Sequence, residues 1–285
     1  MKPELPSAPV SIGGVLDGAI RLYRNSFSRC WLLALIGSVC AGAYAVALAL
    51  KVSSLSTALG QIPVGAGAGS NAASMTAILQ AELNAFTDPI MLALYVVAIV
   101  GSLVTSGAMI LTQSSMLHTD APLSLGQALA TSVRRLPAML LATLLNALAL
   151  VVGLVLLIIP VFYVGGKLQL WLAAMFVDNA SPLEALSTSW RLTRGRWWRG
   201  AAILTITGVI VYVLSLAFGL VAGIAMVVAP LGATGKALVP QVFTLAANLL
   251  TLPLVVSVWL AMYNDFKLRS QGGDLAARVG ALGKA

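Results

Sequence analysis

Charged residues are scarce in this sequence and make up only 9% of its 285 residues. A soluble domain carries roughly 25% of them, and so few charges cannot cover a surface that faces water. The mean hydropathy of +0.96 points the same way. The composition therefore excludes a soluble globular domain and predicts an integral membrane protein whose surface faces lipid.

Cysteine and histidine are nearly absent, and this argues against metal and redox chemistry. Cys30 and Cys40 lie in one apolar run, about 15 Å apart along a helix, which is too far for a disulfide. His118 is the only histidine. The sequence has no Walker loop, no CxxC and no HExxH motif. We therefore predict no catalytic residue, no metal site and no cofactor, and a protein that is not an enzyme.

Six apolar segments approach the length of about 20 residues that crosses a bilayer. They lie at residues 30–50, 89–111, 136–159, 161–177, 201–228 and 239–263. Only Pro160 separates the third segment from the fourth, so these two are expected to form a tight hairpin. The sequence thus predicts an all-α fold with six transmembrane helices within residues 30–265.

Basic residues are distributed unevenly between the loops that join these segments. Lysine and arginine are retained on the cytoplasmic side of a membrane. If the N-terminus is inside, 14 of the 17 basic residues are cytoplasmic. Only Lys51 and Lys236 then lie outside, and Lys167 lies within a span. We therefore expect both termini in the cytoplasm.

This topology assigns each of the remaining segments to one side of the membrane. Residues 1–29 form a cytoplasmic N-terminus with an amphipathic helix, and residues 266–285 form a cytoplasmic tail. The loop at residues 51–88 is external, and a short helix is expected within it at residues 74–86.

Three segments resemble one another and predict an internal repeat. They are "SIGGVLDGAIRLYRNSF" from Ser11, "SLGQALATSVRRLP" from Ser124 and "SPLEALSTSWRLTRGRWW" from Ser181. An alignment on Arg21, Arg134 and Arg191 also brings together Leu16, Leu129 and Leu186, and then Ile20, Val133 and Trp190. Each segment precedes a pair of spans. We therefore expect three repeats of an amphipathic interfacial helix plus a transmembrane hairpin, with cytoplasmic interfacial helices at about 124–135 and 182–195.

Residues 187–200, "STSWRLTRGRWWRG", combine four arginines with three tryptophans. In a soluble protein this mixture would suggest nucleic acid, but no basic domain exists here and no nucleic-acid partner is expected. Tryptophan prefers the membrane interface, and arginine extends toward the headgroups. The residues either hold the topology or bind anionic lipid headgroups. The candidate interface residues are Arg21, Arg24, Arg134, Arg135, Arg191, Arg194, Arg196, Arg199, Trp190, Trp197 and Trp198.

Polar side chains within the spans are few and are candidates for function because burial in lipid is costly. Lys167 is the only charge among them, and it either extends to the interface or lies on a solute or headgroup pathway. The uncharged candidates are Asn146, Gln169 and Asn248. Amide side chains in transmembrane helices more often form hydrogen bonds between two helices than bind a ligand. None of the nine acidic residues lies well inside a span, so the buried acid of a proton-coupled pump is not expected.

Residues 168–200, "LQLWLAAMFVDNASPLEALSTSWRLTRGRWWRG", resemble the signature of the glycerophosphoryl diester phosphodiesterase membrane-domain family. They are also similar to the related YciC-like bacterial inner-membrane proteins. The shared pattern is an apolar span, an acidic residue, "SPLEAL" and then "S-W-x-L-T-x-G-x-W-W". The segment "LDGAIRLYRNSF" resembles the usual start of such proteins. Where the family often has arginine near the start of the fourth span, this chain has Lys167.

The resemblance implies a six-span protein of the bacterial inner membrane without the catalytic domain that gives the family its name. We expect a non-enzymatic protein that binds or organises anionic lipid, or a membrane partner, through its cytoplasmic interfacial helices. The partner is membrane lipid, and a second copy or another membrane protein stays open. The alternative is a small transporter or channel for a lipid-like or anionic solute, with Asn146, Lys167 and Asn248 along one cavity.

Overall fold

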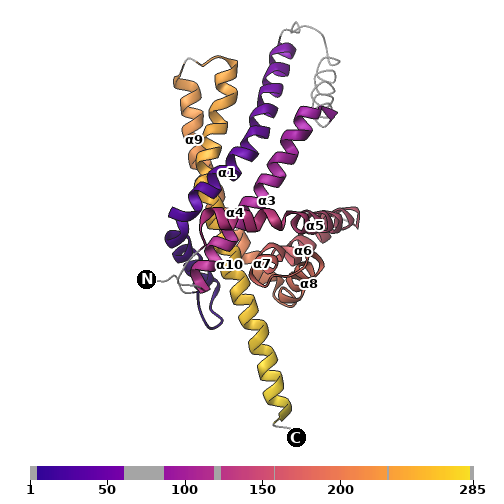
Figure 1. Ribbon diagram of the computed structural model, residues 1–285. Helices are drawn as coiled ribbons and strands as arrows, with labels where there is room; N and C mark the ends of the chain where they lie inside the picture. The colour runs from indigo at the N-terminus through magenta and orange to yellow at the C-terminus, as the bar shows by residue number, and fades with distance from the viewer. Residues whose placement is uncertain (1–4, 61–86, 119–122, 157, 230, 283–285) are drawn as a thin grey trace. The chain divides into compact units, whose positions relative to one another are not determined.

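A computed structural model describes residues 5–60, 87–118, 123–156, 158–229 and 231–282 (Figure 1). Within these ranges the regular elements are all helices, which confirms the predicted all-α class. The helix expected at residues 74–86 lies outside the described residues. The helices are α1 (Ile12–Gly60), α3 (Pro89–His118), α4 (Leu125–Arg134), α5 (Leu136–Leu156), α6 (Ile158–Leu168), α7 (Trp171–Val177), α8 (Pro182–Leu192), α9 (Trp197–Val228) and α10 (Ala233–Leu282).

Five stretches in the described part of the chain are long and apolar enough to cross a membrane. They are Ile12–Lys51, Pro89–Leu117, Leu136–Leu154, Trp197–Val228 and Thr234–Gly272. Protein buries at most 22% of the most apolar window in four of these stretches and 50% in Thr234–Gly272. In α9 only 6% of this window is buried, and Val227 is 86% exposed. Exposed apolar surface of this extent needs hydrocarbon around it. The chain is therefore a multi-pass membrane protein.

The fourth predicted span is divided into two short helices. The apolar stretch Val161–Val177 is shorter than the other five, and α6 ends at Leu168 before α7 begins at Trp171. Side chains of α8 bind the backbone at this break, because Ser189 donates to the Lys167 carbonyl (2.8 Å) and accepts from the Leu170 N–H (3.0 Å). A sixth crossing thus stays a prediction.

Pro160 lies within a helix and not between the third and fourth predicted spans. Helix α5 ends at Leu156 and α6 begins at Ile158, so Pro160 lies in the first turn of α6, where backbone N–H groups have no helical acceptor. Helices α5 and α6 pack against each other, as the predicted hairpin requires.

The chain forms two compact units that four long helices share. The first unit comprises residues 1–34, 103–211 and 250–285, and the second comprises residues 35–102 and 212–249. In the second unit, Tyr44 of α1 contacts Tyr95 of α3, and Lys51 pairs with Asp88. The predicted cytoplasmic segments fall in the first unit, whereas the predicted external loop falls in the second.

Helices α1, α4 and α8 begin in the same way. The hydroxyl of Ser11 accepts the Gly14 N–H (3.2 Å), and the hydroxyl of Ser124 accepts the Gln127 N–H (3.3 Å). The backbone N–H of Ser181 donates to the Glu184 carboxylate (3.3 Å). Each serine therefore stands at the N-terminus of its helix, where serine is strongly favoured.

The three helices also bury the same positions. The positions four and eight residues after each serine are fully or almost fully buried, namely Val15, Ala128 and Ala185, and then Ala19, Ser132 and Ser189. The elements that follow differ, because α1 continues without interruption into an apolar stretch whereas α4 and α8 end first. The three-repeat arrangement stays a prediction that these matches support.

The core of the first unit contains a pattern that sequence analysis missed. An Ala-Met pair lies near the C-terminal part of α3 and recurs in α7 and α10, as Ala108–Met109, Ala174–Met175 and Ala261–Met262, and all six side chains are buried.

Helix α10 continues beyond Phe266, so most of the segment at residues 266–285 that was expected as a cytoplasmic tail is helical.

Candidate membrane-interface site

Exposed arginines follow exposed apolar residues at the same register of α1, α4 and α8. Ile20, Val133 and Trp190 are 43%, 52% and 42% exposed, and the arginine after each is also exposed. An apolar face with arginine beside it is typical of a helix in the membrane interface. The exposed arginines among the candidates are Arg21, Arg24, Arg134, Arg191 and Arg194.

The other three candidate arginines bind groups within the protein. Arg135 donates to the Met175 carbonyl (2.6 Å) and lies 5.7 Å from the centre of the Phe176 ring. Arg196 donates to the Arg269 carbonyl (3.0 Å). Arg199 donates to Asp265 (2.9 Å). Arg21 also donates to a carbonyl, that of Asp17 (3.4 Å), but its side chain is exposed. The five exposed arginines are therefore the candidates that lie at the protein surface.

Asp265 is a buried acid that sequence analysis did not single out. It is 3% exposed and accepts hydrogen bonds from Arg199, from Arg269 (3.0 Å) and from the Val10 backbone N–H (3.2 Å). Both arginines also donate to the Val10 carbonyl, at 2.5 and 2.6 Å. The Asp265 cluster, made of these four residues, fixes the start of the described chain to α9 and α10. The sequence signal for part of this cluster was the spacing of four residues between Asp265 and Arg269, which favours an ion pair on a helix.

The candidate tryptophans differ in exposure. Trp198 is 80% exposed and Trp190 is 42% exposed. Trp197 instead stacks on Tyr163 with ring centres 6.0 Å apart. A Cβ atom on Gly166 would lie 2.5 Å from the Trp197 indole nitrogen, so glycine permits this contact. Of the three candidate tryptophans, Trp190 and Trp198 are therefore the ones exposed at the protein surface.

Lys167 is buried, with 3% exposure, and protein covers its ammonium. It donates to the Thr193 carbonyl (3.2 Å) at the C-terminal end of α8, an end that carries partial negative charge. It also lies 5.4 Å from the centre of the Tyr163 ring and 5.6 Å from that of Trp190, within the range of cation–π attraction. These contacts give Lys167 a structural role between α6 and α8.

The polar residues predicted within the spans belong to different units, since Asn146, Lys167 and Gln169 lie in the first unit and Asn248 in the second. Asn248 lines a pocket of about 160 Å³ in the second unit, together with Ser215 and Phe218, and that lining includes neither Lys167 nor Asn146. The side-chain oxygen of Asn146 and both amide atoms of Gln169 are buried without a hydrogen-bond partner among the described residues. The transporter alternative stays a prediction.

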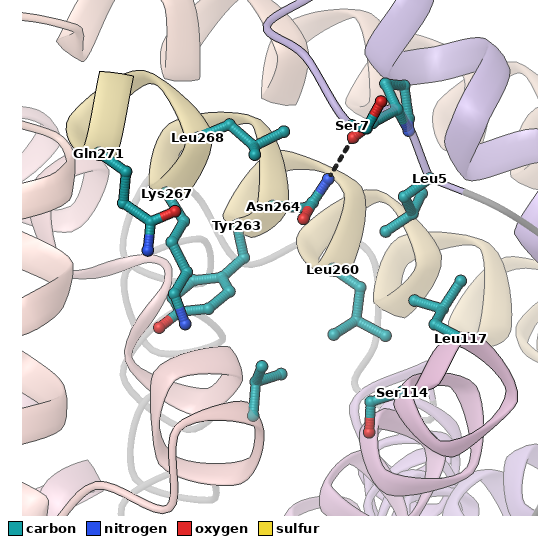
Figure 2. A pocket seen from close by; sticks show the side chains of 12 residues that line it. Leu5, Ser7, Ser114, Leu117, Leu260, Tyr263, Asn264, Lys267, Leu268 and Gln271 are labelled. Carbon is teal, nitrogen blue, oxygen red and sulfur yellow. Dashed lines mark hydrogen bonds between the residues drawn. The ribbon is translucent and has the colours of Figure 1, made fainter. Parts of the chain in front are cut away.

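A pocket of about 550 Å³ lies in the first unit beside residues 260–271 of α10 (Figure 2). Its walls come from residues 5–7, from Ser114 and Leu117 of α3, from Val177 of α7 and from one face of α10. A second pocket of about 340 Å³ shares Ser114, Val177 and Lys267 with it. Sequence analysis did not find this pocket, because its walls come from segments far apart in the chain.

The comparison with known families agrees with the sequence resemblance. Residues 131–268 match the model of the membrane domain of glycerophosphoryl diester phosphodiesterase. Over this segment the chain is similar to that membrane domain. The family match covers the region of α5 to α9, including Lys167, and extends into α10 as far as residue 268. It concerns a membrane domain and not a catalytic one. No curated protein and no solved structure is significantly similar to the chain.

Proposed function

We propose that the protein is a non-enzymatic protein of the bacterial inner membrane that binds anionic lipid headgroups through α1, α4 and α8. The observation that carries this proposal is the shared register of an exposed apolar residue and an exposed arginine on all three helices. Each arginine near an anionic leaflet contributes about 1 kcal/mol. Several such residues on one surface favour anionic over neutral lipid.

The proposal places both termini and the arginines on the cytoplasmic side. The Arg135 side chain, at the start of α5, binds the Met175 carbonyl near the end of α7. The end of α7 therefore lies beside the start of α5, as expected for a hairpin within one repeat. We infer that α5 crosses in one direction and α6–α7 in the other, which makes six crossings and keeps both termini on one side.

The test compares two triple variants of the full chain, one with Arg21, Arg134 and Arg191 changed to Gln and one with the same residues changed to Lys. The lysine variant is the matched control because it keeps the charge. Native mass spectrometry after extraction from the membrane measures the phosphatidylglycerol and cardiolipin that remain bound. We expect retention to fall several-fold in the glutamine variant only. Equal retention in the glutamine variant and the unmodified chain would reject lipid binding and leave only an anchoring role.

A further inference from the structure

We propose that the pocket beside residues 260–271 of α10 binds the phosphate diester of a phospholipid, with the first carbons of an acyl chain in its apolar part. This site is separate from the exposed arginines of α1, α4 and α8. It would hold one lipid in a fixed position, whereas the arginines would attract a leaflet.

The position of the pocket along α10 fits a headgroup. One face of α10 lines it through residues that recur every three or four positions, namely Leu260, Tyr263, Asn264, Lys267, Leu268 and Gln271. These residues extend over about 16 Å of helix. Leu260 lies within the predicted span at residues 239–263, whereas Lys267 and Gln271 lie beyond it. The pocket therefore reaches from the expected hydrocarbon depth to the expected headgroup depth.

The lining contains one cation that can bind a phosphate oxygen while it stays paired with a carboxylate. Lys267 is the only charged residue that lines the pocket among the residues described there. Its ammonium donates to Asp178 (2.6 Å), and its side chain is 38% exposed. An ammonium has three N–H donors, so Lys267 can bind a phosphate oxygen in a charge-assisted hydrogen bond while it keeps Asp178.

Tyr263 holds the same carboxylate from the other side. Its hydroxyl donates to the second oxygen of Asp178 (2.5 Å). Asp178 follows the last residue of α7, and Tyr263 and Lys267 lie one turn apart on α10. The two bonds therefore fix the Lys267 ammonium at the wall of the pocket before a ligand arrives.

The apolar part of the lining distinguishes a lipid from a free phosphate ion. Leu5, Leu117, Val177, Leu260 and Leu268 contribute it. A volume of about 550 Å³ lies within the range of small-molecule pockets and exceeds what one phosphate ion needs. The glycerol and first acyl carbons of a phospholipid supply the apolar surface that these side chains would cover.

The wall formed by residues 5–7 is held in place by hydrogen bonds. The amide of Asn264 donates to the Pro6 carbonyl (3.0 Å), as Figure 2 shows. Val10, four residues after Pro6, is held by the Asp265 cluster. The pocket is thus largely preformed, which lowers the entropic cost of binding.

Native mass spectrometry of the full chain tests the site with phosphatidylglycerol, phosphatidylethanolamine and a diacylglycerol that lacks phosphate. We expect one molecule of either phospholipid to bind more tightly than diacylglycerol. Lys267→Gln should lower the affinity for both phospholipids about tenfold, the loss expected for one charged hydrogen bond. Lys267→Arg should keep most of the affinity. Lys236→Gln is the control, since Lys236 lies in the second unit and is exposed.

A second variant answers the question if Lys267→Gln does not fold. Ser114→Phe fills the shared wall of the two pockets without a change of charge, and it should also reduce binding of the single phospholipid. Equal binding of diacylglycerol, or unchanged binding in a folded variant at either position, would overturn the proposal. So would inorganic phosphate that binds while phospholipid does not. The arginine-to-glutamine triple variant should keep this one lipid, so either proposal can fail alone.

Discussion

Lys167 of α6 donates a hydrogen bond to the carbonyl oxygen of Thr193 (3.2 Å), just beyond the end of α8. The hydroxyl of Thr193 donates back to the Lys167 carbonyl (3.2 Å). The two residues are therefore joined by a reciprocal pair of bonds at the point where the helix through α6 and α7 is interrupted. A charge that is costly in lipid is neutralised here by a helix end and two aromatic rings.

Lys167→Ala should destabilise the protein by about 2–3 kcal/mol, because it removes a charged hydrogen bond and leaves a cavity beneath Trp190. The midpoint of thermal unfolding in detergent measures the change. The control is Lys236→Ala, which removes an exposed lysine and should change stability by at most about 0.5 kcal/mol. Equal midpoints for the two variants would refute a structural role for Lys167.

Asp265→Asn should destabilise the protein by about 3 kcal/mol, because two arginines then lose their carboxylate partner in a buried cluster. Amide hydrogen exchange should also rise at residues 5–10, since Asp265 accepts the Val10 N–H. The matched comparison is Asp17→Asn, which changes an exposed acid on α1 and should leave exchange unaltered. Unchanged protection of residues 5–10 in Asp265→Asn would show that other contacts hold them.

Gly107→Ala should destabilise the protein by about 1–3 kcal/mol. The added Cβ would lie 2.5 Å from the Phe176 ring and 2.6 Å from the Ser132 hydroxyl, which is closer than van der Waals contact allows. Gly208→Ala is the control, because its Cβ meets no atom within 4 Å, and alanine in a helix should be neutral or slightly stabilising. Chemical denaturation compares the two. A Gly107→Ala variant as stable as Gly208→Ala would contradict the packing described here.

The ion pair between Lys51 and Asp88 should make the stability of the second unit depend on pH. The hydrogen bond from Lys51 holds the pKa of the Asp88 carboxyl below its usual range. A carboxyl group whose pKa is lower in the folded state than in the unfolded state stabilises the fold at a pH above the unfolded-state pKa of about 4. This stabilisation is lost as the pH falls through the folded-state pKa. Asp88→Asn should remove this part of the acid sensitivity, and identical acid unfolding of the two proteins would argue against it.

Cysteine labelling from the two sides of the membrane should confirm the topology. Ser187→Cys and Thr87→Cys, each in a chain whose own Cys30 and Cys40 are replaced by alanine, place one reactive thiol at each predicted side. Ser187 is exposed on α8. An impermeant maleimide added to intact cells should label position 87 and not position 187. Labelling of position 187 from outside would reverse the proposed orientation.

Much of the helix arrangement follows from local sequence signals. Each of the serines at 11, 124 and 181 stands ten residues before an arginine, and each lies at the N-terminus of a helix. Such positions are predictable because a serine cap and its partner three residues later are neighbours in the chain. The long apolar stretches are predictable for the same reason, since length and hydropathy are local.

The division of the fourth predicted span was not predictable from its own residues. The stretch at residues 161–177 is apolar throughout except for Lys167 and Gln169. The groups that bind its interrupted backbone are the hydroxyls of Ser189 and Thr193, which belong to another helix. The difference between the exposed arginines and those that bind groups within the protein also depends on residues of other helices. Arg199 resembles Arg191 in sequence, and only the approach of Asp265 from α10 distinguishes them.

The Asp265 cluster joins residues 255 positions apart in the chain. Val10 is synthesised before Arg199, Asp265 and Arg269. Residues 5–10 must therefore remain unattached until the segment with Asp265 has been made. The order of translation thus places this attachment after the synthesis of α10 as far as Arg269, and a ribosome stalled before residue 265 would hold a chain whose residues 5–10 remain accessible to protease.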